Sequence, residues 1–406
     1  MKELILMQNV ETIKKESILI QNVGAIKEVK LDEIKPLTIF VGATATGKST
    51  IMKVILLMRY IYKMVNIRSY LKNAKIAKSP FRLHLKSLLY DGMEELITPK
   101  SVISYSVEVE GTVYTIEIKD KKLLAGTVNI KNKGLVFFKE SLISETRNLI
   151  PTWVSRMSAN KGAQLSFYFH ETFKEFNEAT EKIEHLPIDF LHLALHTKKS
   201  KAGKQHWVES QGAEQSYHIK LEHASSGTQF VVPLLSILRY FAHEFSFKDA
   251  FQRSVLKYLY EQDLLSHFRP EIELTSMPKY VHVYIEEPEL SLDPLAQRAL
   301  LNAMVHQLFH DHAPDRTLHL MLATHSPYIV NQLNLLLGAH YAQEKGWTTN
   351  YPAIAPESIG VYHVDDGGIS SLMAHDNLTQ RRVVNTIGFA TPMEDIYTEY
   401  QQLQQE

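Results

Sequence analysis

Gly42-Ala-Thr-Ala-Thr-Gly-Lys-Ser49 matches the pattern G-x-x-x-x-G-K-[S/T], in which a glycine-containing loop holds phosphate groups. The segments on both sides have the required character. Leu37-Thr-Ile-Phe-Val41 has the composition of a buried strand, and residues 51–65 show helical periodicity. In this arrangement the N–H groups of the loop and of the helix N-terminus point at the phosphates. An accidental match in a Gly- and Thr-rich turn would lack this context, so the sequence predicts binding of a nucleoside triphosphate.

The residues of this P-loop have different expected tasks. Gly42 and Gly47 allow close approach of the backbone, and Lys48 is expected to reach the β- and γ-phosphates. The Ser49 hydroxyl is the expected ligand of Mg²⁺. The predicted nucleotide-binding residues are Gly42, Thr44, Thr46, Gly47, Lys48, Ser49 and Thr50.

Composition narrows the class of protein. The chain has 406 residues, 45% of them hydrophobic and 22% charged, which suits one large α/β domain with an insertion or two domains. A net charge of −1 gives no global case for nucleic acid or an anionic membrane as partner, although a local basic patch stays open. The absence of cysteine excludes disulfides, thiolate metal sites and a Cys nucleophile, and it fits a reducing cytoplasm.

No segment has the character of a membrane anchor. Residues 1–21 lack the apolar core of a signal peptide. Residues 51–65 are apolar, but Lys53, Arg59 and Lys63 interrupt them, and the run is too short to span a bilayer. We therefore expect a soluble, cytoplasmic protein.

Periodicity and turn residues predict the remaining elements. Two short strands are expected around Gly24, and a β-hairpin around Glu110-Gly111. Residues 149–196 are predicted to be helical, with aromatic side chains that form core. Further expected elements are a strand within 128–138, an apolar helix at 232–241, buried strands at 281–285 and 318–323, a hairpin at 359–373 and a polar helix at 392–405.

Two basic segments leave alternatives open. Residues 198–204 are rich in lysine and are either a solvated loop or a phosphate-binding patch. Residues 68–86 form a second basic, polar connection that is expected to be helical in part, and a DNA-binding protein would use both segments as basic contacts.

Acidic residues follow the second buried strand. Phosphoryl transfer needs a metal ion, a positioned water and compensation for the charge on the γ-phosphate. Glu286 is predicted to hold Mg²⁺, mainly through water, and Glu287 to polarise the attacking water. Glu289 either joins this site or caps the next helix. A solvated turn would also explain adjacent carboxylates, but a preceding apolar strand argues against it.

Two further candidates lie at the ends of elements. His325 follows the strand at 318–323 and is the expected sensor of the γ-phosphate; a histidine at this place alone is more often structural. Ser225-Ser-Gly-Thr228 begins a helix, where its hydroxyl and N–H groups could bind an anion, although by itself it is a common N-cap. His310 and His312 are interpreted as surface residues and not as metal ligands.

The order of these motifs resembles the ABC-type ATPases, nearest the prokaryotic branch of SMC, RecF and the ATPase half of OLD proteins. Stand-alone AAA-family ATPases of antiviral defence systems belong to this branch. The resemblance covers residues 18–364. It implies an α/β fold with a mostly parallel central sheet, an antiparallel β-subdomain and a helical insertion. On this resemblance residues 224–228 stand at the signature motif, Ser291-Leu-Asp293 at the D-loop and His325 at the switch histidine.

The sequence departs from the family pattern at several positions. Ala43-Thr44 replaces the usual Pro or Ser followed by Asn, and Glu286 stands where Asp is frequent. The signature has Ala224 for a Leu and Ser226 for a Gly. Gln164 is the residue assigned to the Q-loop glutamine.

The expected domain is a single ABC-type ATPase with four consecutive segments. These are a P-loop lobe (1–66), a β-hairpin and helical insertion or lid (67–220), a core with signature, Walker B, D-loop and switch His (221–345), and a C-terminal hairpin and helix (346–406).

The resemblance also implies an activity and partners. The chain is expected to be a Mg²⁺-dependent ATPase that forms a head-to-tail homodimer, or a higher homo-oligomer, around two ATP molecules. Signature residues Ser225, Ser226 and Gly227 would then act on the nucleotide of the other subunit, and Asp293 would couple the two sites.

The biological output has competing interpretations. No nuclease domain of the kind that OLD proteins append is expected here, so the leading hypothesis is a switch that controls a separately encoded toxin or nuclease in antiviral defence. The alternative is a DNA-binding repair or maintenance ATPase of the RecF/SMC type. A third hypothesis is a nucleotide-binding scaffold without turnover, against which Glu287 and His325 argue.

Overall fold

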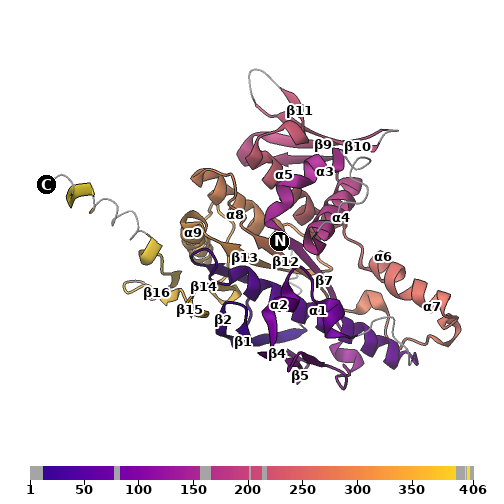
Figure 1. Cartoon of the computed structure of the whole chain (residues 1–406). Helices are drawn as coiled ribbons and strands as arrows, with labels where there is room; N and C mark the ends of the chain where they lie inside the picture. The colour runs from indigo at the N-terminus through magenta and orange to yellow at the C-terminus, as the bar shows by residue number, and fades with distance from the viewer. Residues whose placement is uncertain are drawn as a thin grey trace. The chain divides into compact units, whose positions relative to one another are not determined.

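The computed structural model describes residues 12–76, 83–155, 166–200, 203–212 and 217–389, together with 398 and 400–402 (Figure 1). The chain divides into two compact units, each made of three separate stretches. Unit 1 comprises Met1–Ile34, Lys53–Lys139 and Ser246–Tyr280, and unit 2 comprises Lys35–Met52, Glu140–Phe245 and Val281–Glu406. The predicted division into four consecutive segments stays a prediction.

Unit 1 is built on an antiparallel sheet with strand order β2-β1-β4-β5-β6. Its strands are β1 (Ile13–Val23), β2 (Ile26–Leu31), β4 (Ile97–Val109), β5 (Thr112–Lys119) and β6 (Lys122–Leu124). Along β4, buried residues alternate with partly exposed ones, as expected for a sheet with one covered face. The two predicted strands around Gly24 and the predicted hairpin around Glu110-Gly111 are confirmed.

The turn between β4 and β5 explains why that hairpin is tight. Glu110 and Gly111 have φ values of 49° and 71°. Two successive residues with positive φ form the two-residue loop whose twist matches that of the flanking strands.

A buried ion pair lies in the core of unit 1. Arg59 and Glu16 are almost fully buried, at 2% and 3% exposure, and their side chains are hydrogen bonded to each other. The Tyr105 hydroxyl also donates to Glu16 Oε1, at 2.5 Å. Because the pair is buried together with its hydrogen-bond partner, burial of each charge is compensated.

The central sheet of unit 2 has the strand order β15-β14-β3-β13-β12-β7. Its strands are β3 (Leu37–Val41), β7 (Phe137–Ile143), β12 (Lys279–Glu286), β13 (Thr317–Thr324), β14 (Ile359–Asp365) and β15 (Gly368–Ser371). β3 pairs in parallel with β13 on one side and β14 on the other, and every residue of β3 is buried. The predicted α/β fold class is confirmed, as are the predicted strands at 37–41, 281–285 and 318–323.

Helices follow the strands of this sheet. α1 (Lys48–Asn73) begins directly after the P-loop, α8 (Pro294–Phe309) follows β12, and α9 (Pro327–Glu344) follows β13. The chain places Pro at the first turn of both α8 and α9, where its missing N–H leaves no hydrogen bond unmade. The predicted helix at 51–65 is therefore the central part of a longer one.

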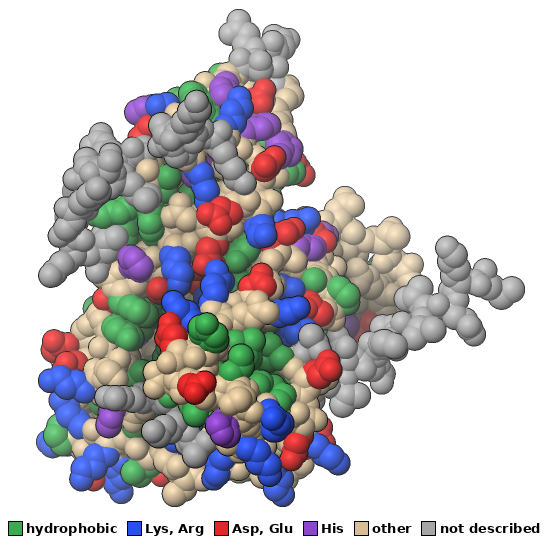
Figure 2. Space-filling view, turned by 90° about the vertical axis from the view of Figure 1, so that its right-hand side faces the viewer, with side chains coloured by type: hydrophobic (Ala, Val, Ile, Leu, Met, Phe, Trp, Pro, Cys, Tyr) green, Lys and Arg blue, Asp and Glu red, His purple; other side chains and the backbone are tan. Residues whose placement is uncertain are grey.

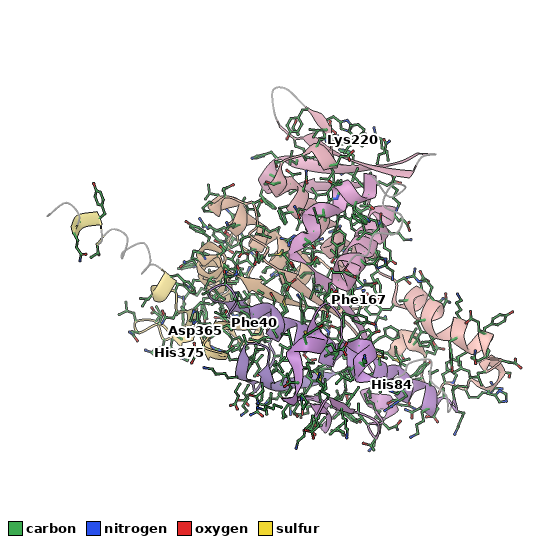
Figure 3. The ribbon with its side chains drawn as sticks, viewed as in Figure 1. Phe40, His84, Phe167, Lys220, Asp365 and His375 are labelled. Atoms are coloured by element: carbon green, nitrogen blue, oxygen red, sulfur yellow. The ribbon has the colours of Figure 1, made fainter. Side chains whose placement is uncertain are left out.

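A second sheet and three helices complete unit 2. The sheet has the order β11-β10-β9-β8, with β8 (His185–Ile188), β9 (Leu193–Ser200), β10 (Gly203–Ser210) and β11 (His218–Lys220). Lys220, the last residue of β11, is labelled in Figure 3. The helices are α3 (Ile150–Ser155), α4 (Phe167–Lys182) and α5 (Ser226–Arg239).

Two sequence-based expectations are wrong in this part of the chain. Residues 149–196 are not helical throughout, because strands begin at His185. Buried Leu195 and Thr197 alternate with the more exposed His196 and Lys198, and this period of two belongs to a half-buried strand. Residues 198–204 are accordingly parts of paired strands and not a loop, as far as the described residues extend.

The expected strand within residues 128–138 is also largely absent, since β7 begins only at Phe137. Side chains of α1 bind the backbone of this segment instead of a neighbouring strand. Asn73 donates to Ile130 O at 3.1 Å, and Asn66 Oδ1 accepts from Val136 N–H at 3.1 Å.

The remaining elements are short. Unit 1 also contains α2 (Met93–Leu96), α6 (Phe247–Phe251) and α7 (Lys257–Glu261). The predicted hairpin at 359–373 is confirmed as β14 and β15, and β16 (Met373–His375) pairs with β17 (Arg382–Val384) beyond it. The predicted helix at 392–405 lies almost wholly outside the described residues.

No single helix among the described residues is both long and apolar enough to cross a membrane. One pair of helical segments joined at a bend, Ser226–Glu244 and Phe247–Glu261, meets the requirements together, by length and composition only.

Candidate functional site

The ends of the parallel strands bring the predicted site residues to one edge of the central sheet. The register aligns Val41, the last residue of β3, with Thr324 at the end of β13 and with His363 near the end of β14. The P-loop follows Val41, and residues 324–327, which we call the switch segment, begin at Thr324. Ligand sites of open α/β sheets lie at this edge, outside the carboxyl ends of the strands.

The P-loop is held by its own side chains and by the neighbouring strand. Lys48 donates from Nζ to the carbonyl oxygens of Gly42 and Ala43, at 3.0 and 2.6 Å, and Thr46 Oγ1 donates to Ala43 O at 2.9 Å. A Cβ atom added at Gly42 would collide with the carbonyl oxygen of Val364 in β14. Glycine is therefore required at this position for steric reasons.

Lys48 is also electrostatically coupled to the acids. Burial lowers the pKa of Lys48, while the carboxylates of Glu287 and Glu289 raise it. The ammonium group is thus bound to loop carbonyls and lies within the electrostatic influence of the two carboxylates. To bind phosphate, it would exchange the carbonyl oxygens of Gly42 and Ala43 for phosphate oxygens.

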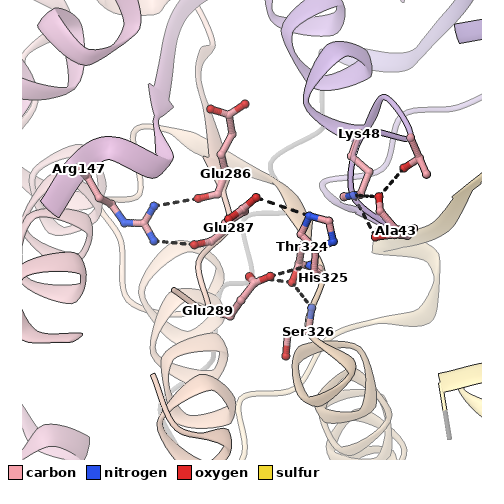
Figure 4. A network of polar contacts seen from close by, with 11 residues as sticks. Ala43, Lys48, Arg147, Glu286, Glu287, Glu289, Thr324, His325 and Ser326 are labelled. Carbon is pink, nitrogen blue, oxygen red and sulfur yellow. Dashed lines mark hydrogen bonds and ion pairs between the residues drawn. The ribbon is translucent and has the colours of Figure 1, made fainter. Parts of the chain in front are cut away.

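Glu286 and Glu287 differ in their environments. Glu286 ends β12 and is buried, whereas the side chain of Glu287 is 37% exposed. Their side chains point in different directions, and that of Glu287 points toward His325 (Figure 4). The carboxylate of Glu286 therefore lies in the protein interior, and that of Glu287 lies within reach of water.

His325 lies beside Glu287. Its Nε2 atom is 3.6 Å from Glu287 Oε1, and its side chain is 32% exposed. The structure thus brings together the two residues that the sequence predicts to be catalytic, although they are separated by 38 positions along the chain.

Glu289, whose role the sequence left open, binds the switch segment. It accepts the Thr324 hydroxyl at Oε2, at 2.8 Å, and the His325 backbone N–H at Oε1, at 2.6 Å. The next helix, α8, is capped instead by Asp293. Glu289 therefore fixes the backbone that carries His325 and does not cap a helix.

The residues predicted to form the signature and the D-loop lie against each other within one chain. A Cβ added at Gly227 would be 2.8 Å from the carbonyl oxygen of Ser291 and 3.2 Å from Leu292 Cδ2. Ser225 and Ser226 are exposed, and Ser225 Oγ accepts the Thr228 N–H as the N-cap of α5. Asp293 caps α8 through bonds from Leu295 and Ala296 N–H.

A cavity of about 660 Å³ opens beside the P-loop. Residues 42–44 and His325 line it together with residues of the C-terminal part of the chain, which are His363, Ser370, Leu372, Asn385, Gly388 and Phe389. Its size is that of a small-molecule site.

A family model described as an AAA domain matches residues 17–223, slightly more than half of the chain. The chain belongs to the AAA domain family. The sequence-based assignment to this type of ATPase is thereby confirmed. No curated protein matches this AAA domain protein by sequence.

Several solved structures are similar over most of their length. The SMC head domain from Thermotoga maritima matches at 11% identity and a TM-score of 0.37, over 89% of this chain and 99% of that one. The Smc head domain from Pyrococcus furiosus, bound to the C-terminal domain of ScpA, matches at 10% identity and 0.39, over 95% and 99%. The recombination mediator RecF matches at 9% identity and 0.34, over 89% and 99%. At these low scores no residue role is transferred from them.

Sequence reasoning missed one residue at the centre of this AAA domain protein's site. Arg147 is fully buried and donates from Nη1 to Glu286 O and from Nη2 to Glu287 O, both at 2.8 Å (Figure 4). No motif surrounds it, and it follows β7 by only four positions. Proximity to the end of a sheet strand was the one available signal. Gln164, the residue predicted for the Q-loop, lies outside the described residues.

Proposed function

We propose that this AAA domain protein binds ATP with Mg²⁺ at the P-loop and hydrolyses the bond to the γ-phosphate. The observation that carries the proposal is the convergence of Lys48, Glu287 and His325 at one sheet edge, with Glu287 and His325 3.6 Å apart. Lys48 would bind the phosphates. Thr44, Thr46 and Thr50 would contribute hydroxyl groups, and the N–H groups of the loop would complete the cradle.

The donor set fits a magnesium ion. Ser49 follows the P-loop lysine at the start of α1, and Glu286 supplies a carboxylate at the end of β12. Hydroxyl and carboxylate oxygens, completed by water and phosphate, are ligands that Mg²⁺ accepts. The ion, when bound, neutralises charge on the phosphates.

Glu287 is the proposed general base. Its partly exposed carboxylate would take a proton from a water molecule whose oxygen attacks the γ-phosphorus, while the bond from that phosphorus to the bridging oxygen of ADP breaks. His325 would donate a hydrogen bond to the γ-phosphate. Glu289 holds the backbone of His325 at this place.

Two copies are proposed to form a head-to-tail pair around two nucleotides. The exposed hydroxyls of Ser225 and Ser226, with the N-terminal N–H groups of α5, suit an anion presented by a second copy. Asp293 is exposed at the adjoining D-loop. ATP would close this pair and hydrolysis would open it, so the chain would act as a switch.

The proposed output is control of a separately encoded effector, a toxin or nuclease, in antiviral defence. This part rests on analogy with stand-alone ATPases of the same branch. The alternative, a DNA-binding repair or maintenance ATPase, has less support from the described basic residues. Lys204 is engaged by Asn177 O at 2.8 Å and by Glu181 at 3.0 Å, and Arg68 donates to three backbone carbonyls. Basic and acidic side chains are interspersed on the face drawn in Figure 2.

The test compares Glu287→Gln with wild type and with a control, Glu344→Gln, which changes an exposed glutamate of α9. Glu287→Gln should lower single-turnover hydrolysis about 10²–10⁴-fold and keep ATP binding, and native mass should show a pair that persists in ATP. The control should behave as wild type. Full turnover in Glu287→Gln would refute the role of Glu287, and a monomer with ATP bound would refute the pair.

The trapped pair also tests the output. A single protein that co-purifies in fixed stoichiometry from the native host would support an effector. Nuclease-sensitive DNA in its place would support the repair alternative, for which stimulation should fall steeply with salt.

A further inference from the structure

Arg147 is a buried cation whose hydrogen bonds go to backbone carbonyls on separate segments. Besides the bonds to Glu286 and Glu287, its Nη1 atom donates to Ser144 O at 3.1 Å and its Nε atom donates to Phe230 O at 3.2 Å. Phe230 belongs to α5, the helix that the signature begins, and the guanidinium carbon lies 5.1 Å from the centroid of the Phe230 ring. One side chain therefore joins the signature helix to the end of β12.

Arg147 stays charged in this environment. Burial lowers its pKa to about 10, opposed by the carboxylates of Glu289, Glu145, Glu287 and Glu286. At neutral pH the guanidinium is therefore a cation, and its planar fork presents fixed donors to the carbonyl groups of Glu286 and Glu287.

The backbone of Glu287 needs such support. Its φ angle is 44°, in the left-handed region that residues other than glycine rarely occupy. Both backbone polar groups of Glu287 are hydrogen bonded: its N–H donates to Ala323 O at 2.8 Å, and its carbonyl oxygen accepts from Arg147 Nη2. Strained backbone of this kind persists where its surroundings determine it, and it is frequent at functional sites.

We propose that Arg147 is a positioning residue that fixes the direction of Glu287 and makes it depend on the signature helix. The inference rests on the proposed function of Glu287. Gly227 precedes Phe230 by less than one helical turn, so a shift of α5 when the signature meets a second copy's nucleotide moves the Phe230 carbonyl. The guanidinium passes this shift to the Glu287 carbonyl, and pairing of two copies thereby sets the base.

A purely structural role makes a different prediction. If Arg147 only fills and ties the interior of unit 2, its replacement should lower stability and nucleotide affinity together. If it positions Glu287, the rate of hydrolysis should fall while ATP affinity holds, and the rise of specific activity with protein concentration, which reports pairing, should flatten.

The first test is Arg147→Lys, which keeps the charge and loses the fork. The matched control is Arg316→Lys. Arg316 is also buried and also donates to a backbone carbonyl, that of Phe241, at 3.0 Å. It lies directly before the first residue of β13, whereas the site lies at the other end of that strand, at Thr324. Arg147→Lys should reduce single-turnover hydrolysis about 10–100-fold, the effect of a misplaced catalytic group, with the ATP dissociation constant changed less than about twofold by this argument. Arg316→Lys should keep both the rate and its concentration dependence.

A second variant keeps the test decisive if Arg147→Lys does not fold. Phe230→Leu removes the ring beneath the guanidinium and leaves the carbonyl in place, so it should lower the rate in the same direction by a smaller factor and weaken the concentration dependence. Wild-type rate and concentration dependence in the folded variants would overturn the inference. Equal loss of ATP affinity and rate in Arg147→Lys and Arg316→Lys would also overturn it.

The outcomes separate this inference from the proposed function. Wild-type turnover that Glu287→Gln abolishes, together with unchanged turnover in Arg147→Lys, would overturn the inference alone. Wild-type protein without turnover dependent on Glu287 would overturn the proposed function and the inference together.

Discussion

Replacement of Gly227 by alanine should separate the steric demand of the signature from ordinary helix energetics. Gly227 is the second residue of α5, where a Cβ would lie 2.8 Å from Ser291 O in the D-loop. Gly338, inside α9, is the matched control, because an added Cβ there meets no heavy atom within 4 Å in the described part of the chain.

The two substitutions share one energetic contribution and differ in another. Alanine in place of a helical glycine is expected to stabilise by about 0.5–1 kcal/mol at both sites. At Gly227 the Ser291 carbonyl must also move by about half an ångström to reach ordinary contact distance, and overpacking of this kind costs about 1–3 kcal/mol. Since the helix contribution is common to both, the difference between the variants isolates the contact.

Thermal unfolding of the two variants measures that difference. Gly338→Ala should melt slightly above wild type, and Gly227→Ala should melt about 2–12 °C below Gly338→Ala, at about 2–4 °C per kcal/mol. Gly227→Ala should also reduce turnover, because the displaced Ser291 lies in the D-loop. Equal midpoints for the two variants and unchanged turnover in Gly227→Ala would refute the steric reasoning.

Further predictions concern binding, stability and pH. Lys48→Ala should weaken ATP binding by about 2 kcal/mol, the value of a charged hydrogen bond, in a fluorescence titration; an unchanged affinity would exclude Lys48 from phosphate binding. Arg59→Met leaves Glu16 buried without its cation and should lower the free energy of unfolding by about 3–5 kcal/mol, whereas Lys14→Met, at an exposed pair, should cost less than about 1 kcal/mol; similar urea midpoints would contradict this. Burial lowers the pKa of His206 to about 4, so the folded state favours the neutral imidazole. The resulting contribution to the free energy of unfolding is fully present above about pH 6.5 and is lost as pH falls through about 4. The loss should reach about 3 kcal/mol in wild type and be absent in His206→Gln, and parallel pH profiles would refute it.

The elements at the site were predictable because their signals are local. A buried strand before the P-loop, a helix after it and acids at the end of β12 each follow from adjacent residues. Parallel pairing then aligns the strand ends, so Val41 and Thr324 lie level although the sequence separates them widely. The positions of Lys48, Glu287 and His325 near one another follow from that topology.

Arg147 was not predictable in the same way. Its partners are backbone carbonyls, which every residue carries, and they lie on segments up to 140 positions away. No spacing rule or residue type marks such a bond. Glu289 was ambiguous for a related reason: a carboxylate after a strand can cap a helix or bind another loop, and only the position of Thr324 settles which.

The strand content of residues 185–210 was missed because aromatic and charged residues masked a period of two. His185, His196 and Trp207 lie in one cross-strand row of the β8–β10 sheet. In sequence, His185 and His196 fall within the region predicted to be helical, and Trp207 lies beyond it in a part with no predicted element. Pairing with neighbouring strands decided the outcome over local helix propensity.

Ser225 and Asp293 are each the N-cap of a helix and are each also predicted to act at the nucleotide site. Ser225 uses an oxygen lone pair to accept the Thr228 N–H, and its hydroxyl also lies 2.8 Å from Thr228 Oγ1. If Thr228 donates in that contact, the Ser225 proton remains for a phosphate, so the cap and the signature role are compatible. Asp293 is an acceptor only and uses Oδ1 for both of its cap bonds. It can therefore bind a donor from a second copy through Oδ2, but it cannot donate to phosphate. In the proposed pair, Ser225 would therefore bind the nucleotide and Asp293 would bind a donor of the neighbouring chain.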